Sequence, residues 1–212
     1  MTMRLFVLGA TGHTGAQVLD LALARGHQVT AFVRSPQKIA RRDDALTIVP
    51  GDPFRADEMA SALAGHDAVV SVLGLPPREA LRPSTRMAEF AASTVAAMSR
   101  ARVERLAILS AAVLFPGRGL QFAFFRWFLR HHARDLVAME AVVRATSLDW
   151  TIARPGRLIA STDAGYRTAR DALVAGAPLS MSFRAVAAFL VDCVERRAHA
   201  RDIVGLARAA TS

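Results

Sequence analysis

The sequence predicts an α/β fold: a doubly wound, mostly parallel sheet with helices on both of its faces. Short runs of apolar and β-branched residues alternate with longer segments whose apolar residues recur at helical spacing. This alternation is typical of repeated strand–helix units around a parallel sheet. A glycine-rich loop between the first predicted strand and the first predicted helix favours the same class of fold.

The expected strands are short apolar runs, as buried strands of a parallel sheet are. In chain order they lie at 3–8, 28–33, 46–49, 68–73, 106–110 and 150–153, with a further short strand near Ile203. Segments of helical periodicity separate them at 14–24, 57–64, 85–100 and 135–145, and a last helix is expected at 184–196. Cys193, the only cysteine, follows the core spacing of that last helix, so we expect a small core residue and no disulfide within the chain.

Composition favours a single domain over residues 1–212, because 52% of the residues are hydrophobic and no linker interrupts the pattern. No segment is apolar enough for a signal sequence or a membrane span, so we expect a cytoplasmic protein with no membrane partner. The net charge of +9 comes almost entirely from scattered arginines, with Lys38 as the only lysine. We interpret this charge as compositional bias and expect no nucleic-acid partner.

The strongest motif is the glycine-rich loop after the first strand. Gly9 permits a tight turn, Gly12 lets the backbone approach a pyrophosphate, and Gly15 lets the helix pack closely on the strand. Free N–H groups and the positive end of the helix dipole favour phosphates at this point. We therefore expect a Rossmann-type dinucleotide site, which also includes the loop residues Ala10, Thr11, His13 and Thr14.

The end of the second strand indicates which dinucleotide binds. NAD-preferring proteins place an acid there to bond the ribose hydroxyls, whereas this chain has Arg34. A guanidinium binds a 2′-phosphate in a bidentate manner, and Ser35 and Lys38 supply further donors. We predict that NADP(H) is preferred over NAD(H). An ordinary exposed arginine remains the alternative, since arginines are frequent in this segment.

Other strand ends supply further candidates. Cofactor contacts are expected at Asp52, Pro53, Leu73, Gly74, Ser110 and Ala111. For Asp52 a turn is an equal alternative, while Gly74 permits close approach by a ligand. Ser110 is a candidate catalytic residue, because a hydroxyl at the nicotinamide end orients substrate or carboxamide. His132 is the second, as an acid or base, and no metal is expected because further ligands at suitable spacing are missing.

Two stretches that follow strands are expected to form the walls of a substrate pocket. Segment 75–83 holds three prolines, and segment 116–132 holds five aromatic residues. The run 120–129 is too short to cross a bilayer, so a lid, a homodimer contact and a packed helix remain open. Four arginines in these walls favour an anionic ligand, with ordinary surface charge as the alternative: Arg78, Arg118, Arg126 and Arg130.

Taken together, these features resemble the atypical short-chain dehydrogenase/reductase group. The glycine loop, Arg34, Asp52, Ser110 and segment 139–156 are most like the NAD(P)H-binding flavin reductases related to biliverdin reductase B, with NmrA-like proteins as neighbours. The resemblance implies one NAD(P)-binding domain over 1–212, with Pro155 and Gly156 also at the cofactor. It further implies the reduction of flavins or linear tetrapyrroles.

Two departures limit this resemblance. The Tyr-x-x-x-Lys pair of ordinary short-chain dehydrogenases would fall near His132 and Leu136, so alcohol and ketone chemistry is disfavoured. Gly156 stands where biliverdin reductase B has a pocket histidine. Because a flavin or a tetrapyrrole accepts hydride directly, we predict an NADPH-dependent oxidoreductase, monomeric or homodimeric, acting on a small planar substrate that can be anionic. The alternative is a non-catalytic NADP-binding regulatory protein of the NmrA-like type.

Overall fold

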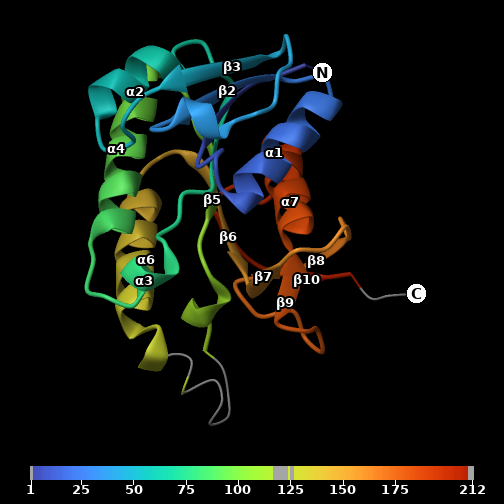
Figure 1. The fold of residues 1–212 in the computed structure, drawn as a ribbon. Helices are drawn as coiled ribbons and strands as arrows, with labels where there is room; N and C mark the ends of the chain where they lie inside the picture. Colours follow the sequence, from blue (N-terminus) through green and yellow to red (C-terminus); the bar gives the residue numbers. More distant parts are fainter. Residues whose placement is uncertain (1, 117–123, 125–126, 210–212) are drawn as a thin grey trace.

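One eight-stranded sheet forms the centre of the computed structural model, which describes residues 2–116, 124 and 127–209 (Figure 1). The strands lie in the order β3, β2, β1, β4, β5, β6, β10, β8. All neighbours are parallel except β8 against β10. In chain order the strands are β1 (Arg4–Leu8), β2 (Gln28–Val33), β3 (Leu46–Pro50), β4 (Ala68–Ser71), β5 (Arg105–Leu109), β6 (Asp149–Pro155), β8 (Tyr166–Arg170) and β10 (Asp202–Arg208).

The strand order reverses at β1. The chain runs outward from β1 through β2 to β3, then crosses back to place β4 on the other side of β1. In open α/β sheets, ligands bind outside the carboxyl ends of the strands at such a reversal. The glycine-rich loop leaves β1 at this position.

Helices cover both faces of the sheet, as Figure 1 shows. One face carries α1 (His13–Ala24) and α7 (Phe183–Arg196), and the other carries α2 (Ala56–Leu63), α4 (Arg86–Ala101) and α6 (Arg130–Arg144). Short elements complete the described fold: η1 (Pro36–Lys38), α3 (Pro77–Ala80), η2 (Ala112–Leu114) and a small sheet of β7 (Arg157–Ile159) and β9 (Ser180–Ser182).

Burial on both faces explains why the strands are apolar without a polar alternation. In β1, Leu5 and Val7 belong to the core beneath α1 and α7, whereas Phe6 and Leu8 belong to the core beneath α2, α4 and α6. All four side chains are fully buried, and each contributes roughly 1.5–3 kcal/mol of hydrophobic stabilisation.

The predicted fold class is confirmed, and the predicted strands and helices recur with small shifts at their ends. The largest shift is in α6, which begins at Arg130 rather than at residue 135. Its first turn is polar and half-exposed, so apolar spacing does not mark it. His131 and His132 therefore lie on a helix and not in a connection, and Ser110 lies just after β5 rather than in it. Within the described ranges, no helix is both long and apolar enough to cross a membrane.

Candidate functional site

Two glycines allow the loop after β1 to pack closely against neighbouring backbone. Gly9 has a φ of +83°, and a Cβ there would lie 2.7 Å from the carbonyl oxygen of Val72, just beyond β4. A Cβ at Gly15 would lie 2.1 Å from the carbonyl oxygen of Gly9. No side chain fits at either position, so the loop follows a close path across the reversal point.

This path leaves the first amides of α1 available to an anion. Gly12 is the N-cap, no side chain caps the helix, and the first turn carries no acidic residue. The Gly12 carbonyl accepts the first intrahelical bond from Ala16 at 2.9 Å, which leaves the preceding amides without helical partners. Thr11, Gly12 and His13 are exposed. The arrangement fits a diphosphate.

The segment after β2 carries two basic side chains with open donors, one directly after the strand and one at the end of η1. Arg34 and Lys38 are exposed, and neither pairs with a carboxylate anywhere in the part of the chain that is described. Ser35 lies between them, half-buried. Arg41 differs, because its guanidinium binds Asp20 at 2.8 Å and Asp43 at 3.2 Å. Unlike Arg41, Arg34 and Lys38 therefore have donors that no carboxylate of the described ranges occupies.

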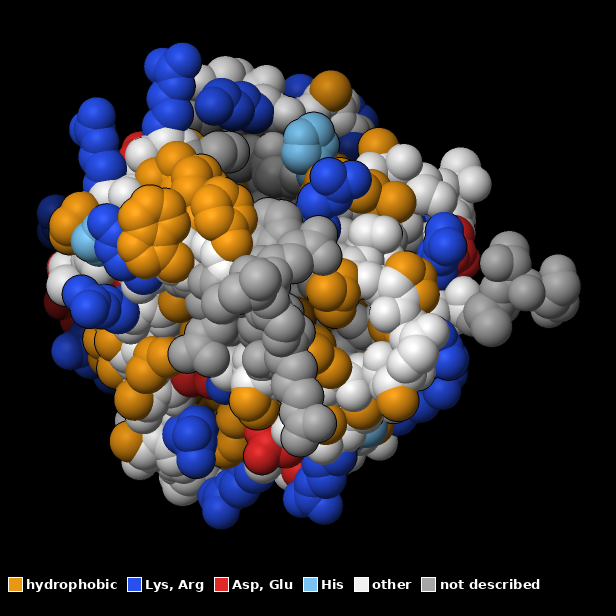
Figure 2. All heavy atoms as spheres, turned by 90° about the horizontal axis from the view of Figure 1, so that it is seen from below, with side chains coloured by type: hydrophobic (Ala, Val, Ile, Leu, Met, Phe, Trp, Pro, Cys, Tyr) orange, Lys and Arg blue, Asp and Glu red, His pale blue; other side chains and the backbone are white. Residues whose placement is uncertain are grey.

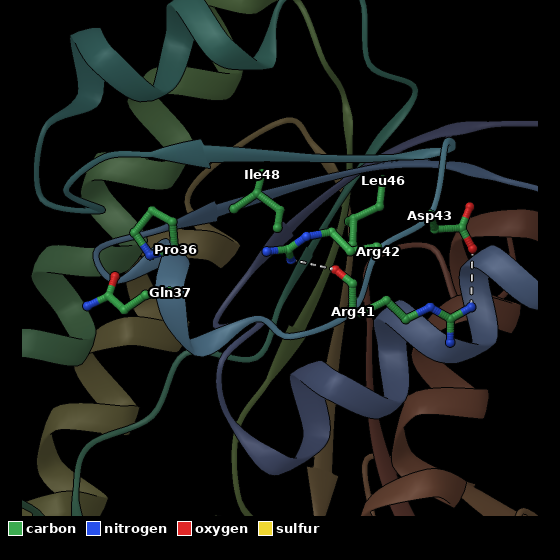
Figure 3. Close-up of a pocket in the computed structure, with 7 residues that line it drawn as sticks. All are labelled: Pro36, Gln37, Arg41, Arg42, Asp43, Leu46 and Ile48. Atoms are coloured by element: carbon green, nitrogen blue, oxygen red, sulfur yellow. Dashed lines mark hydrogen bonds and ion pairs between the residues drawn. The ribbon is translucent and has the colours of Figure 1, made fainter.

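A cavity of about 360 Å³ lies beside this region without including those residues. Figure 3 shows its lining along β3 and the preceding loop, where Arg41 turns toward Asp43. Leu46 and Ile48 line it from the sheet face that packs toward α1 and α7. Its arginines are already engaged, since Arg42 donates to the carbonyls of the 39–41 segment. These engaged arginines make the cavity a poor site for a dinucleotide phosphate.

The remaining strand-end candidates differ in what they offer. The Asp52 carboxylate accepts the Phe54 amide at 3.1 Å, so it forms a turn, and Pro53 is buried. Leu73 is half-buried beside exposed Gly74, where a Cβ would meet nothing within 4 Å. This open position allows a ligand to approach the backbone next to the reversal point.

At Gly156 the limiting neighbour is the protein itself. A Cβ there would lie 2.2 Å from the Leu179 carbonyl oxygen, which accepts a hydrogen bond from the Arg157 amide. Pro155 is buried at the end of β6. The packing of β7 against the segment before β9 accounts for the glycine.

A buried polar unit lies beside the carboxyl ends of β5 and β6. Ser110 Oγ lies 2.6 Å from Glu140 Oε1, and Arg154 binds both carboxylate oxygens of Glu140, through Nε at 2.9 Å and Nη2 at 2.5 Å. Ser110 is 8% exposed and Glu140 3%. The Arg154 guanidinium also lies 4.6 Å from the centre of the Phe115 ring. Ala111, the residue after Ser110, is half-buried at the start of η2.

Sequence reasoning missed Glu140 and Arg154 as site residues. A signal was present, because Glu140 occupies a core-facing position of α6 among Leu136, Met139 and Val143. A charge within such a stripe requires a buried partner. Which residue is that partner depends on how α6 packs on β6.

His132 lies apart from this unit. It is half-buried on α6, and its Nδ1 is buried without a hydrogen-bond partner among the described residues. Burial lowers the pKa of His132, although the nearby Asp135 carboxylate acts in the opposite direction. Within the described ranges no hydrogen bond joins His132 to Ser110. The geometry therefore groups Ser110 with Glu140 and Arg154.

The aromatic wall is only partly described. Phe124, Trp127 and Phe128 are 58%, 61% and 44% exposed, and Phe124 contacts the other two rings at centroid distances of 6.2 and 6.3 Å. Figure 2 shows a hydrophobic cluster on this face with basic side chains beside it. These three rings lie at the surface, as their exposed fractions show.

The arginines predicted to line the substrate pocket are likewise only partly within the described residues. The Arg130 guanidinium lies 5.1 Å from the Trp127 ring centre, and Arg78 is exposed on α3. The predicted wall residues Arg118, Phe122, Phe125 and Arg126 lie outside the described residues.

Fold and loop together define a dinucleotide-binding protein of the Rossmann type. Comparison with known proteins identifies the group: residues 9–197 match the NAD(P)H-binding family, and the chain belongs to it. The chain is 31% identical to the oxidoreductase stcQ of Emericella nidulans, over 93% of this chain and 80% of that protein. The resemblance to atypical short-chain dehydrogenase/reductases is confirmed, and the matches support an NAD(P)H-binding oxidoreductase.

Solved structures share the fold at lower identity. A candidate NADH-flavin reductase from Streptococcus pneumoniae superposes with a TM-score of 0.76 at 21% identity, covering 98% of this chain and 100% of that one. A short-chain dehydrogenase/reductase from Veillonella parvula in complex with NADP gives 0.79 at 18% identity, covering 100% and 97%. At these identities the likeness concerns the fold alone.

Proposed function

We propose that this protein is an NADPH-dependent reductase that transfers hydride to a flavin-like or other planar acceptor. The observation that carries the proposal is the loop at the strand-order reversal, where Gly9 and Gly15 fix the backbone and no side chain caps the first turn of α1. The matched family binds NAD(P)H, and the Streptococcus pneumoniae neighbour is a candidate flavin reductase.

The preference for NADPH rests on the end of β2. Arg34 follows β2 directly and Lys38 is the last residue of η1, and neither has a carboxylate partner in the described ranges. A 2′-phosphate there would gain charge-assisted hydrogen bonds, whereas a plain ribose would leave the guanidinium without an anionic ligand. The bound NADP of the Veillonella parvula structure belongs to that protein and supports only the class of cofactor.

In this proposal the residues of the protein position the dinucleotide and the acceptor. Reduced nicotinamide supplies the hydride when it is bound. The loop and Arg34 fix the dinucleotide, Gly74 leaves room beside β4, and Ser110 orients a polar group at the reacting end. The Tyr-x-x-x-Lys pair is absent from the sequence, so a planar acceptor whose proton comes from solvent suits the site better than a ketone.

The proposal is tested by mixing purified protein with NADPH and FMN, riboflavin, biliverdin or a quinone. We expect oxidation of NADPH that depends on the acceptor, measured as the decrease in NADPH absorbance. The Gly12→Val variant should oxidise NADPH more slowly. Binding of NADPH with no turnover on any acceptor would contradict a reductase.

A non-catalytic NADP-binding regulator is the second candidate. It is favoured by the Ser110–Glu140 hydrogen bond, because the hydroxyl proton of Ser110 already points at a carboxylate. A regulator would bind NADP tightly, show no turnover and change its affinity for a partner protein with the redox state of the dinucleotide. Turnover of a physiological acceptor removes this candidate.

A further inference from the structure

We infer that Glu140 and Arg154 fix Ser110 as a hydrogen-bond acceptor, so that the ligand group bound at Ser110 is an N–H donor and not a carbonyl oxygen. The inference rests on the proposed function, because it concerns the reacting end of the same site. Its residues come from β6, from α6 and from the position after β5.

Arg154 and Glu140 form a buried ion pair. The guanidinium has five N–H donors and no acceptor, and it binds both oxygens of Glu140 at 2.9 and 2.5 Å. Without this carboxylate the arginine charge would be unpaired in a position where its side chain is 11% exposed. The pair is therefore a carboxylate with a guanidinium, and the Phe115 ring covers the cation.

A carboxylate in this position commits the proton of Ser110. Glu140 Oε1 can only accept, so the Ser110 hydroxyl donates to it across 2.6 Å. A hydroxyl has a single proton, and the Ser110 oxygen therefore presents only lone pairs to anything else that reaches it. The backbone N–H of Ser110 is engaged as well, because it donates to the Ala153 carbonyl at 2.7 Å.

This polarity excludes one familiar role of such a serine. Reduction of a carbonyl is assisted by a donor that stabilises negative charge developing on oxygen. Ser110 would oppose that oxygen with its own lone pairs. An N–H group suits it, and two sources fit the site: a ring N–H of the acceptor, such as flavin N3–H, or the carboxamide N–H of nicotinamide. Glu140 and Arg154 act through Ser110, so both are positioning residues.

The experiment compares paired ligands that differ in a single N–H. One arm measures kcat/KM for riboflavin against 3-methylriboflavin. The other arm measures it for NADPH against the 3-acetylpyridine analogue, whose methyl ketone replaces the carboxamide. We expect the native protein to favour the N–H member of one pair by roughly 3- to 10-fold, as one hydrogen bond predicts, and the arm that responds identifies the source.

Two variants distinguish the hydrogen-bond polarity of Ser110 from a general structural role of the three residues. Ser110→Ala leaves the Glu140–Arg154 pair intact and should abolish the discrimination within the responding pair. Glu140→Gln keeps the shape of the side chain, but its amide nitrogen can donate to Ser110 and free the hydroxyl proton. We therefore expect Glu140→Gln to reverse the preference toward the member without the N–H. The exposed Glu89→Gln serves as the matched control and should change nothing.

The outcomes are distinct for the two proposals. Turnover with equal kcat/KM within both pairs, or a preference that survives in Ser110→Ala, would overturn the inference and leave the reductase assignment standing. NADPH binding without turnover on any acceptor contradicts the reductase instead; the inference is then tested by the affinity of the protein for NADPH against its acetylpyridine analogue. Thermal unfolding of each variant confirms that the comparison is made on folded protein.

Discussion

The carboxylate of Asp135 on α6 caps the first turn of α4, accepting the amides of Met87 at 3.2 Å and Ala88 at 3.1 Å. Asp135 is almost fully buried, and Thr85, the N-cap of α4, provides no side-chain cap of its own. The two helices that flank the Ser110 side of the sheet are thus joined by a polar contact as well as by apolar packing.

Replacing this cap should destabilise the protein without affecting dinucleotide binding. Asp135→Ala leaves two amides at the start of α4 without their acceptor, and we expect a loss of about 1–3 kcal/mol in the free energy of unfolding. Urea denaturation measures it. Asp44→Ala, at an exposed position, is the control and should lie close to the native value; an equal effect of the two substitutions would argue against the cap.

Two glycines of the loop should respond in opposite ways. Gly12 has a φ of −86° and a Cβ there would meet only the Gly9 carbonyl oxygen at 3.4 Å, so Gly12→Val should preserve stability and weaken NADPH binding by filling the phosphate space. Gly15→Ala places a Cβ 2.1 Å from the Gly9 carbonyl oxygen and should lower the melting temperature. Calorimetric titration and thermal unfolding of both variants make the comparison.

Arg34→Ala should weaken NADPH binding by about 10- to 100-fold and leave NADH binding nearly unchanged, because only the 2′-phosphate loses a charge-assisted partner. Arg41→Ala is the matched control, since Arg41 is already held by Asp20 and Asp43. The ratio of the two dissociation constants is the measurement. A parallel loss for both dinucleotides would place Arg34 at the diphosphate instead.

Acid should destabilise the fold through two histidines. Burial lowers the pKa of His132 and of His66 below the ordinary value of 6.5. The unfolded chain then binds more protons than the folded one between each lowered pKa and about 6.5, so stability rises with pH across that window and falls as pH drops through it. Urea midpoints from pH 7 to pH 5 should show this slope, and His132→Gln should reduce it. A pH-independent difference between His132→Gln and the native protein would rule out the titration of this histidine.

The features of this molecule that depend on a local sequence pattern can be predicted from the sequence. The run around Phe6 is apolar on both sides because both faces of the sheet are covered, and the loop from Gly9 to Gly15 has the spacing that a strand-to-helix turn with a bound phosphate requires. Each feature lies within a few residues, so it can be predicted without knowledge of the packing.

Other features depend on contacts between distant elements. Arg154 meets Glu140 only because β6 and α6 lie side by side, and Asp135 meets Met87 across α6 and α4. The polar first turn of α6 hides its start from any search for apolar spacing. Edge strand β8 pairs with β10 through residues that are largely half-buried or exposed, so little in its composition marks it as a strand.

The close packing of Gly9 against the segment after β4, and of Gly15 against Gly9, distinguishes two parts of the proposed cofactor site. The glycine loop belongs to the packed framework and tolerates little change, whereas Arg34 and Lys38, the side chains proposed to select NADPH, are exposed to solvent. If the proposed preference for NADPH holds, a change of coenzyme therefore requires substitutions at solvent-facing positions alone, and the melting temperature of the protein should survive the exchange.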